Sequence, residues 1–249
     1  MDLIQKKEKR RVVRLSTGIK ELDEKMGGGI PKGFSVIITG PPGSGKTIFT
    51  LQCIVNAVQR GEHVLFISSE QYLPGIIDQA LQFNWDLEEM VQENKLKLEC
   101  LDPWKLYELN TMSYLKDLIY SNNWDLIVID SINSLAPVSV APSNVLDNID
   151  RGYQPDTFVE MGKGHVLMLY DLIRQKEITC LIIAQKDTGK SGDKLVKILE
   201  YRGDALIDFD AGSVGKTTTR TIQIKKMRQT KIELTQNNID ITDAGITIR

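Results

Sequence analysis

The residues best suited to chemistry form a glycine-rich run at positions 40–47, Gly-Pro-Pro-Gly-Ser-Gly-Lys-Thr. This run fits the P-loop pattern G-x-x-x-x-G-K-[ST] at every fixed position. The backbone N–H groups that would cradle phosphate, at the start of a helix, belong to Gly43, Ser44, Gly45, Lys46 and Thr47. The Lys46 ammonium would reach the β- and γ-phosphates, and the Thr47 hydroxyl would ligate Mg²⁺. The run therefore predicts binding of a nucleoside triphosphate with magnesium.

A carboxylate stands where a P-loop protein needs one for the metal. Residues 124–130 read Trp-Asp-Leu-Ile-Val-Ile-Asp, an apolar run that ends in Asp130. This is the Walker B form, in which the aspartate is expected to hold Mg²⁺ through water. An aspartate at a strand end is by itself more typical of a turn or a cap, so this interpretation depends on the P-loop.

Two more polar residues end apolar runs and are candidates for the hydrolytic step. Glu70 directly follows the run 64–69, and Gln185 closes the run 179–184. A carboxylate at the phosphate edge of a sheet could orient and deprotonate the attacking water, and an amide there could sense the γ-phosphate. The alternatives are a surface glutamate before a loop and an ordinary glutamine at the end of a strand.

These residues must be positioned by the elements around them, which alternate short apolar runs with helical patterns. This alternation predicts an α/β fold with a mostly parallel central sheet flanked by helices. The expected strands are 34–39, 63–69, 96–101, 125–130 and 179–184, and the expected helices are 47–59, 74–83, 105–121 and 165–176. From residue 205 onward, the alternating segments 205–209, 220–227, 231–234 and the last residues predict antiparallel strands that extend one edge.

Two stretches, 137–163 and 186–202, fit neither pattern and are expected to be long loops. Both follow the carboxyl ends of expected strands, where open α/β sheets place their ligand sites. Residues 1–14 are expected to be a basic N-terminal extension, and residues 15–249 a single domain.

The composition is that of an ordinary globular protein. The 249 residues carry a formal net charge of −2, so binding to nucleic acid or to a membrane would need a local patch. The apolar runs are too short to span a bilayer, and the charged N-terminus lacks the apolar region of a secretory signal. The three cysteines are unclustered, which predicts buried thiols in a reducing compartment and a cytoplasmic protein.

Beyond the P-loop, the chain resembles the KaiC-like ATPases, a branch of the RecA/RadA superfamily that is common in archaea. The resemblance covers nearly all of the chain after Val13. It is carried by the P-loop together with Ser16-Thr17-Gly18-Ile19, Leu22-Asp23, Gly27-Gly28-Gly29-Ile30-Pro31-Lys32-Gly33, Ser68-Ser69-Glu70, Asp130-Ser131, Ala184-Gln185, Asp204-Ala205-Leu206-Ile207, Lys226-Met227-Arg228 and Ile241-Thr242-Asp243-Ala244-Gly245-Ile246.

The resemblance implies a RecA-type core that binds ATP. It makes Glu70 the catalytic glutamate and Gln185 the residue that reads the nucleotide state. It also implies that Lys226 and Arg228 reach the ATP of a neighbouring subunit, and hence a ring, commonly a hexamer, or a filament. From the residues alone, these two cations are equally typical of an edge strand guarded by charge.

The chain departs from the family pattern at two positions. Gln71 replaces the second glutamate that usually follows Glu70, which predicts slow hydrolysis if both acids are needed. Gln229 replaces the glycine that usually follows Arg228, which bears on the geometry of the Lys-x-Arg pair.

Three functions remain open at this point. The favoured one is a regulatory ATPase whose nucleotide state sets its assembly and its binding to a protein partner. The second is a recombination accessory resembling RadA paralogues, which would bind single-stranded DNA through the two expected loops. The cations for this second function are Arg151, Lys163, Lys186, Lys190, Lys194 and Lys197, although the first loop is also rich in aspartate. The third is a nucleotide-binding scaffold with little turnover, with which Glu70 is at odds.

Overall fold

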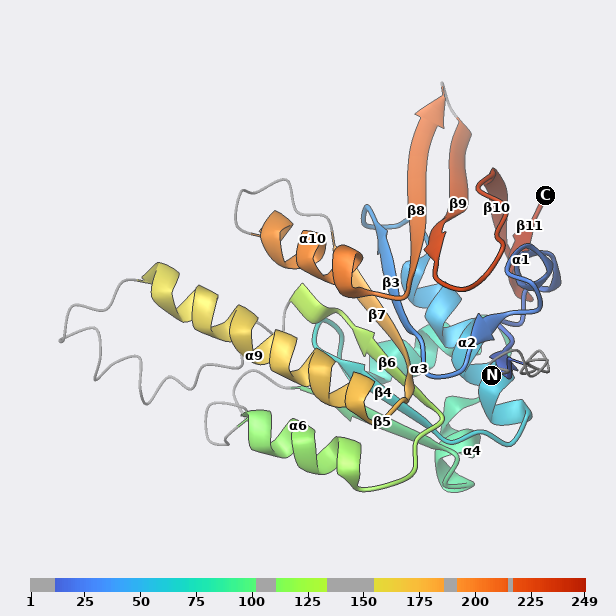
Figure 1. The fold of residues 1–249 in the computed structure, drawn as a ribbon. Coiled ribbons are helices and arrows are strands. Elements are labelled where there is room, and N and C mark those ends of the chain that lie inside the picture. The colour runs from blue at the N-terminus through green and yellow to red at the C-terminus, as the bar shows by residue number, and fades with distance from the viewer. Residues whose placement is uncertain (1–11, 102–110, 134–154, 186–191, 215–216) are drawn as a thin grey trace, which may run out of the picture.

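The computed structural model describes residues 12–101, 111–133, 155–185, 192–214 and 217–249. These residues form a nine-stranded sheet in the order β11-β10-β9-β8-β3-β7-β6-β4-β5, with helices packed on both faces (Figure 1). The strands of the sheet are β3 (Ser35–Gly40), β4 (Val64–Ser68), β5 (Leu96–Cys100), β6 (Leu126–Asp130), β7 (Thr179–Gln185), β8 (Ala205–Val214), β9 (Thr217–Met227), β10 (Gln236–Thr242) and β11 (Gly245–Ile248). The helices are α1 (Lys20–Lys25), α2 (Lys46–Gln59), α3 (Leu73–Leu81), α4 (Leu87–Gln92), α6 (Thr111–Tyr120), α9 (Pro155–Gln175) and α10 (Gly192–Arg202). A separate two-stranded sheet joins β1 (Arg14–Leu15) to β2 (Ile30–Pro31).

The central strands are apolar on both faces because helices cover both faces. Every residue of β3, β4 and β6 is buried, as expected for the inner strands of a parallel sheet. Successive residues of β3 alternate between two cores. Val36 and Ile38 pack on the side of α2, and Ile37 packs on the side of α6, α9 and α10.

The carboxyl ends of the parallel strands meet at one edge of the sheet. Gly40 at the end of β3 lies opposite Gln185 on β7, and Asp130 at the end of β6 lies opposite Ser68 on β4. The predicted α/β fold with a mostly parallel sheet and antiparallel C-terminal strands is therefore confirmed.

The expected loop 186–202 is wrong over most of its length, because α10 occupies Gly192–Arg202. Leu195, Val196 and Leu199 are buried against the sheet on one face of this helix. The two lysines of this helix, Lys194 and Lys197, interrupt the apolar pattern in the sequence. Residues 186–191, with Lys186 and Lys190, lie outside the described part, and Lys197 lies on the helix.

The expected loop 137–163 is also partly wrong, because α9 begins at Pro155, ten residues before the predicted start. Proline is well suited to the first turn of a helix, whereas glycines at 162 and 164 lower the helix propensity of the following turn. Residues 137–154, including Arg151, lie outside the described part.

The expected strand 231–234 is absent from the structure, and the next strand is β10. This segment packs beside α1 instead. Ile232 contacts the core, the Glu233 N–H donates to the Lys25 carbonyl at 3.4 Å, and their side chains form an ion pair at 3.0 Å.

The basic extension was predicted to reach residue 14, but Arg14 belongs to the fold. It lies in β1, and its guanidinium donates to the carbonyls of Met26 and Gly29 at 3.0 and 2.8 Å. Residues 1–11 lie outside the described part.

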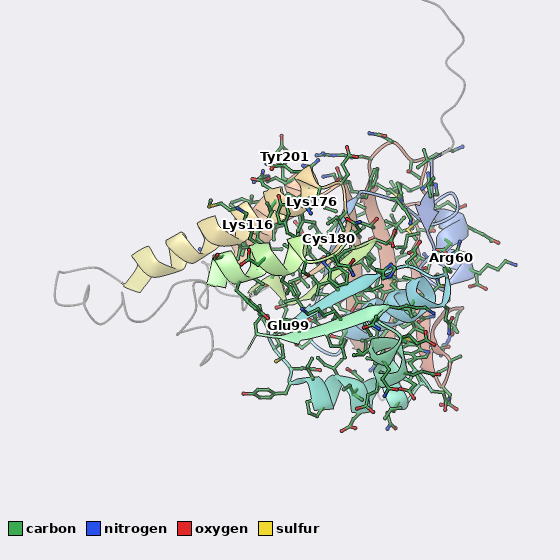
Figure 2. All side chains as sticks on the ribbon, turned by 90° about the horizontal axis from the view of Figure 1, so that it is seen from below. Arg60, Glu99, Lys116, Lys176, Cys180 and Tyr201 are labelled. Atoms are coloured by element: carbon green, nitrogen blue, oxygen red, sulfur yellow. The ribbon has the colours of Figure 1, made fainter. Side chains whose placement is uncertain are left out.

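The three cysteines are free thiols. Cys53 and Cys180 are buried, as predicted, and Cys180 lies in the interior of the molecule in Figure 2. Cys100 is only half-buried. Among the described helices, none has the length and apolar character needed to cross a bilayer.

Candidate functional site

The glycine-rich run connects the end of β3 to the start of α2 and requires glycine at its ends. At Gly40, φ is +143°, and a Cβ atom would lie 2.3 Å from the carbonyl oxygen of Phe209. At Gly45, which precedes the first residue of α2, φ is +104°, in the left-handed region. The loop therefore turns tightly into the helix with little side-chain bulk.

The start of α2 has the properties of an anion site. Among the described residues, no side chain caps this helix, and its first turn holds no acidic residue. The Lys46 ammonium lies at the same place and donates to the Pro41 carbonyl at 2.8 Å. Burial lowers the pKa of Lys46, while the charges of Asp130 and Glu70 oppose this shift. N–H groups without a side-chain cap, the positive end of the helix dipole and an ammonium fit a polyphosphate.

The predicted metal residues are in direct contact. The Thr47 hydroxyl donates to Oδ2 of Asp130 at 2.8 Å. Burial raises the pKa of Asp130 to about 6; the Glu70 charge adds to this shift, and the Thr47 hydrogen bond and the Lys46 charge reduce it. A hydroxyl and a poorly hydrated carboxylate are oxygen ligands suited to Mg²⁺.

Glu70 is held at the same edge by Gln185, the last residue of β7, and by Ser131, which directly follows β6. The Gln185 amide donates to Oε1 and Oε2 of Glu70 at 2.9 and 2.7 Å, and the Ser131 hydroxyl donates to Oε1. The structure thus brings together Lys46, Thr47, Asp130, Glu70 and Gln185, as predicted from the convergence of the strand ends.

Asn133 belongs to this site, although it is part of no motif in the sequence. Its amide donates to the Gln185 carbonyl at 3.0 Å, and its Oδ1 accepts from the Gln185 N–H at 2.8 Å. These two bonds fix the backbone of Gln185, whose side chain then reaches Glu70. The available signal was its position three residues after Asp130.

Arg220, on β9, is a second residue of the site that was not predicted. Its guanidinium Nε donates to the Gly43 carbonyl at 3.0 Å, which places a cation beside the P-loop. The sequence marked residues 220–227 only as an alternating strand, so the contact depends on how far the β8–β9 hairpin extends past β3.

Lys226 and Arg228 lie at the other edge of the sheet. Lys226 Nζ donates to the carbonyls of Glu200 and Tyr201 at 3.1 and 2.9 Å, and the Arg228 guanidinium contacts Oδ1 of Asp204 at 3.4 Å. Asp204 pairs with Ser35 at the start of β3, whereas the P-loop follows the end of this strand. Five steps along a strand span roughly 17 Å, so this pair is far from its own phosphate site.

The residue after Arg228 has a conformation that favours glycine. Gln229 has φ of +56°, in the left-handed region, which costs a residue with a side chain about 1–2 kcal/mol. The glycine usual at this position in KaiC-like ATPases would adopt this turn without strain, and the chain makes the same turn with glutamine.

Asp130→Asn is expected to raise the unfolding free energy of the nucleotide-free protein at pH 7 by about 1–3 kcal/mol. Because the pKa of Asp130 is about 6 in the fold and 3.8 ordinarily, the folded state binds more protons between these values. Its contribution to stability therefore falls as pH rises from about 4 to about 6 and stays low above that range. Urea unfolding at pH 7 and pH 4 measures the difference, which should shrink at pH 4. A variant less stable than wild type at pH 7 would contradict this assignment of the buried charge.

A family model described as "ATPase: KaiC" matches residues 15–249 of the chain. A UPF0273 protein of Saccharolobus solfataricus is 27% identical, over 95% of this chain and 82% of that protein. The circadian clock protein KaiC2 of Synechocystis is 26% identical, over 95% of this chain but only 40% of that protein. The crystal structure of a KaiC-like protein from Pyrococcus horikoshii has a TM-score of 0.75 at 23% identity and covers 96% of this chain and 100% of that chain.

Proposed function

The chain belongs to the KaiC ATPase family, an ATP-binding branch of the RecA superfamily, and on this premise we propose that it hydrolyses ATP with magnesium at sites completed by a neighbouring subunit. The observation that carries the proposal is that two side-chain contacts lie next to each other at one edge of the sheet. Thr47 bonds to Asp130 beside the P-loop, and Glu70 bonds to Gln185 next to them. This arrangement has separate groups for phosphate, for metal and for water.

Each group has a distinct role in this proposal. The N–H groups of residues 43–47 and the Lys46 ammonium hold the phosphates, and Thr47 and Asp130 hold Mg²⁺. The metal, when bound, neutralises charge on the β- and γ-phosphates. Glu70 orients the attacking water and accepts its proton.

The contacts of Glu70 provide a way to couple hydrolysis to the nucleotide. In this structure the Gln185 amide donates to both carboxylate oxygens of Glu70. The same amide could instead donate to a γ-phosphate oxygen. ATP would then draw Gln185 away, and Glu70 would lose these two hydrogen bonds before it accepts the proton of water.

The placement of Lys226 and Arg228 supports a site shared between subunits. They lie roughly 17 Å along the sheet from their own P-loop, so they are available to a neighbour's nucleotide. Because each subunit would give these cations to one neighbour and receive them from another, the contact is head-to-tail and generates a ring or a filament. The nucleotide would then control assembly, which fits a regulatory ATPase with a protein partner.

Arg228→Ala is expected to reduce turnover per subunit by at least about 100-fold, since arginines acting across an interface contribute about 10³–10⁵ to phosphoryl transfer. Phosphate release is measured at a protein concentration where the wild type is assembled, with the mass of the assembly recorded in ATP and in ADP. Normal turnover with an unchanged assembly would remove Arg228 from this role.

Phosphate release with and without single-stranded DNA, at physiological salt and with Mg²⁺ or a chelator, tests the function as a whole. The expected result is magnesium-dependent turnover at a rate that DNA does not change. Stimulation by DNA would favour the recombination accessory and direct attention to α10, where Lys197 is exposed. ATP binding without turnover would favour the scaffold.

A further inference from the structure

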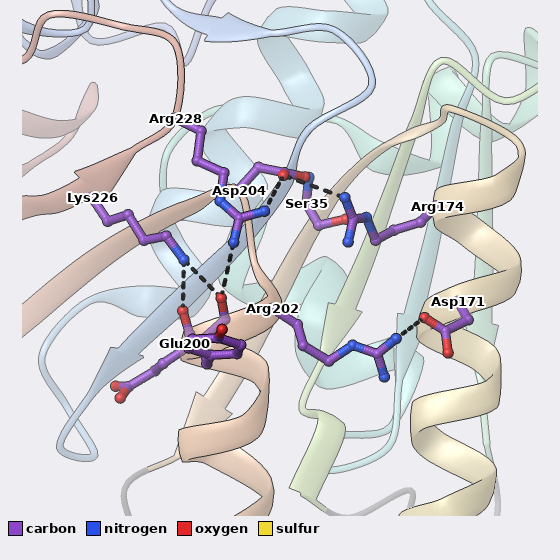
Figure 3. Close-up of polar contacts among 9 residues, drawn as sticks. Ser35, Asp171, Arg174, Glu200, Arg202, Asp204, Lys226 and Arg228 are labelled. Carbon is purple, nitrogen blue, oxygen red and sulfur yellow. Dashed lines mark hydrogen bonds and ion pairs between the residues drawn. The ribbon is translucent and has the colours of Figure 1, made fainter.

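Asp204 is a buried carboxylate at the junction of three segments that are distant in the sequence. It lies just before β8 and is 8% exposed. Its Oδ2 accepts from the Ser35 N–H at 3.1 Å, and its Oδ1 pairs with Arg228 at 3.4 Å and with Arg174 on α9 at 3.5 Å. Figure 3 shows the two guanidinium groups reaching the carboxylate from opposite sides.

The backbone of Asp204 joins the same partners. Its N–H donates to the Ser35 carbonyl, and its carbonyl accepts from the Arg228 N–H, both at 2.8 Å. Ser35 is the first residue of β3, which leads directly to the P-loop. Asp204 thus contacts both the backbone and the guanidinium of Arg228. Through Ser35, it also connects Arg228 to the strand that leads to the subunit's own phosphate site.

The end of α10 supplies the remaining contacts of the cationic pair. The Arg228 guanidinium also donates to the Tyr201 carbonyl at 3.2 Å, and Lys226 donates to the carbonyls of Glu200 and Tyr201. Cations are favoured at a helix C-terminus, but the carbonyl groups at the end of α10 bind Lys226 as well as Arg228 and so do not distinguish between them. The charged, buried acceptor in this cluster is Asp204, and it contacts only Arg228 of the pair. Beside them, the Tyr201 side chain is 79% exposed and lies at the molecular surface in Figure 2.

We propose that Asp204 is a positioning residue for catalysis in the neighbouring subunit, where it fixes the direction in which Arg228 approaches that subunit's nucleotide. The proposal rests on the proposed function. A free arginine side chain loses about 2 kcal/mol of rotamer entropy when it is ordered. An anchor present before the subunits meet removes part of this loss from the catalytic step. One carboxylate oxygen maintains the fold through Ser35, and the other pairs with Arg174 and orients Arg228.

Asp204→Asn tests whether the two carboxylate oxygens have these separate roles. The amide oxygen can still accept from the Ser35 N–H, whereas an NH₂ group faces Arg228 and Arg174. The expected result is a fall in kcat of about 10–100-fold, with KM for ATP and the mass of the assembly close to wild type. Asp171→Asn is the matched control, because it removes the nearby ion pair to Arg202, which touches neither Lys226 nor Arg228. The control should retain turnover within about twofold.

Mixed assemblies separate positioning from a structural defect. Glu70→Gln subunits keep their cations, and Asp204→Asn subunits keep their own P-loop and Glu70. In an equal mixture, about one quarter of the head-to-tail contacts join a site that contains Glu70 to an Arg228 that is still paired with Asp204. Activity should therefore recover above that of either variant alone, and Arg228→Ala mixed with Glu70→Gln provides the reference.

The outcomes distinguish a failure of this inference from a failure of the proposed function. Two results would overturn the inference when the reference mixture does recover activity. Either Asp204→Asn alone retains wild-type kcat, or the mixture of Asp204→Asn with Glu70→Gln fails to recover activity. In both cases, Asp204 does not position Arg228. If the reference mixture does not recover, the shared site itself is wrong. Should the asparagine variant fail to assemble, Asp204→Glu, which moves the charge by one methylene, is expected to show the same loss and recovery.

Discussion

Glu70→Gln is expected to lower the turnover number for ATP by about 10²–10⁴-fold and to leave ATP affinity nearly unchanged. Glutamine has almost the same shape and can still accept from Ser131 and Gln185, but it does not take a proton from water. The variant should therefore load ATP and Mg²⁺ and then stop. Single-turnover phosphate release, together with an equilibrium titration of ATP binding, measures both effects on the same preparation.

Gln71→Ala is the matched control for this experiment. Gln71 follows Glu70, and its contacts with Ser68 are made by its backbone, since its N–H donates to the Ser68 hydroxyl and its carbonyl accepts from it. Removing its side chain should change turnover by less than about threefold. Unchanged turnover in Glu70→Gln would assign the water-activating role to another group.

Lys46→Ala is expected to reduce ATP affinity by at least about 100-fold, since the loss of charge-assisted hydrogen bonds to phosphate costs about 3 kcal/mol or more. The buried ammonium bonds to the Pro41 carbonyl in this structure, so its loss should have little effect on the fold. Equilibrium titration with ATP and with ADP measures the loss, and thermal unfolding checks the fold.

Lys95→Ala is a control of the same chemical type. Lys95 is an exposed lysine paired with Glu93, away from the P-loop, and its removal should leave ATP affinity unchanged. A Lys46→Ala variant that binds ATP within about fivefold of wild type would mean that the backbone N–H groups of the P-loop dominate phosphate binding.

The phosphate and metal residues could be predicted because each belongs to a continuous motif. Residues 40–47 specify their own turn, and Asp130 ends an apolar strand that is visible in the sequence. Glu70 comes shortly after a buried strand, and Gln185 is the last residue of another. Since parallel strands end at a common edge, predicting the strands was enough to predict that these residues converge.

The remaining features depend on contacts between distant segments, which local patterns do not specify. Asn133 acts by fixing the backbone of Gln185, and Arg220 reaches Gly43 across the β8–β9 hairpin. The role proposed for Asp204 follows from its pairing with Ser35 and Arg228, although the sequence marked it only as part of a family motif. Helix α10 was missed because lysines interrupt its apolar face. The distance between Lys226 and the P-loop likewise follows from the direction of β9 within the sheet.

The central claim is that hydrolysis takes place at a site that two subunits complete together. Its most direct test is the rate of phosphate release per subunit, measured with saturating ATP and Mg²⁺ over a wide range of protein concentration while the mass of the particles is recorded. We predict a low rate for dilute monomers that rises with assembly and reaches a plateau when assembly is complete. A rate per subunit that is the same for monomers and assemblies would contradict the claim.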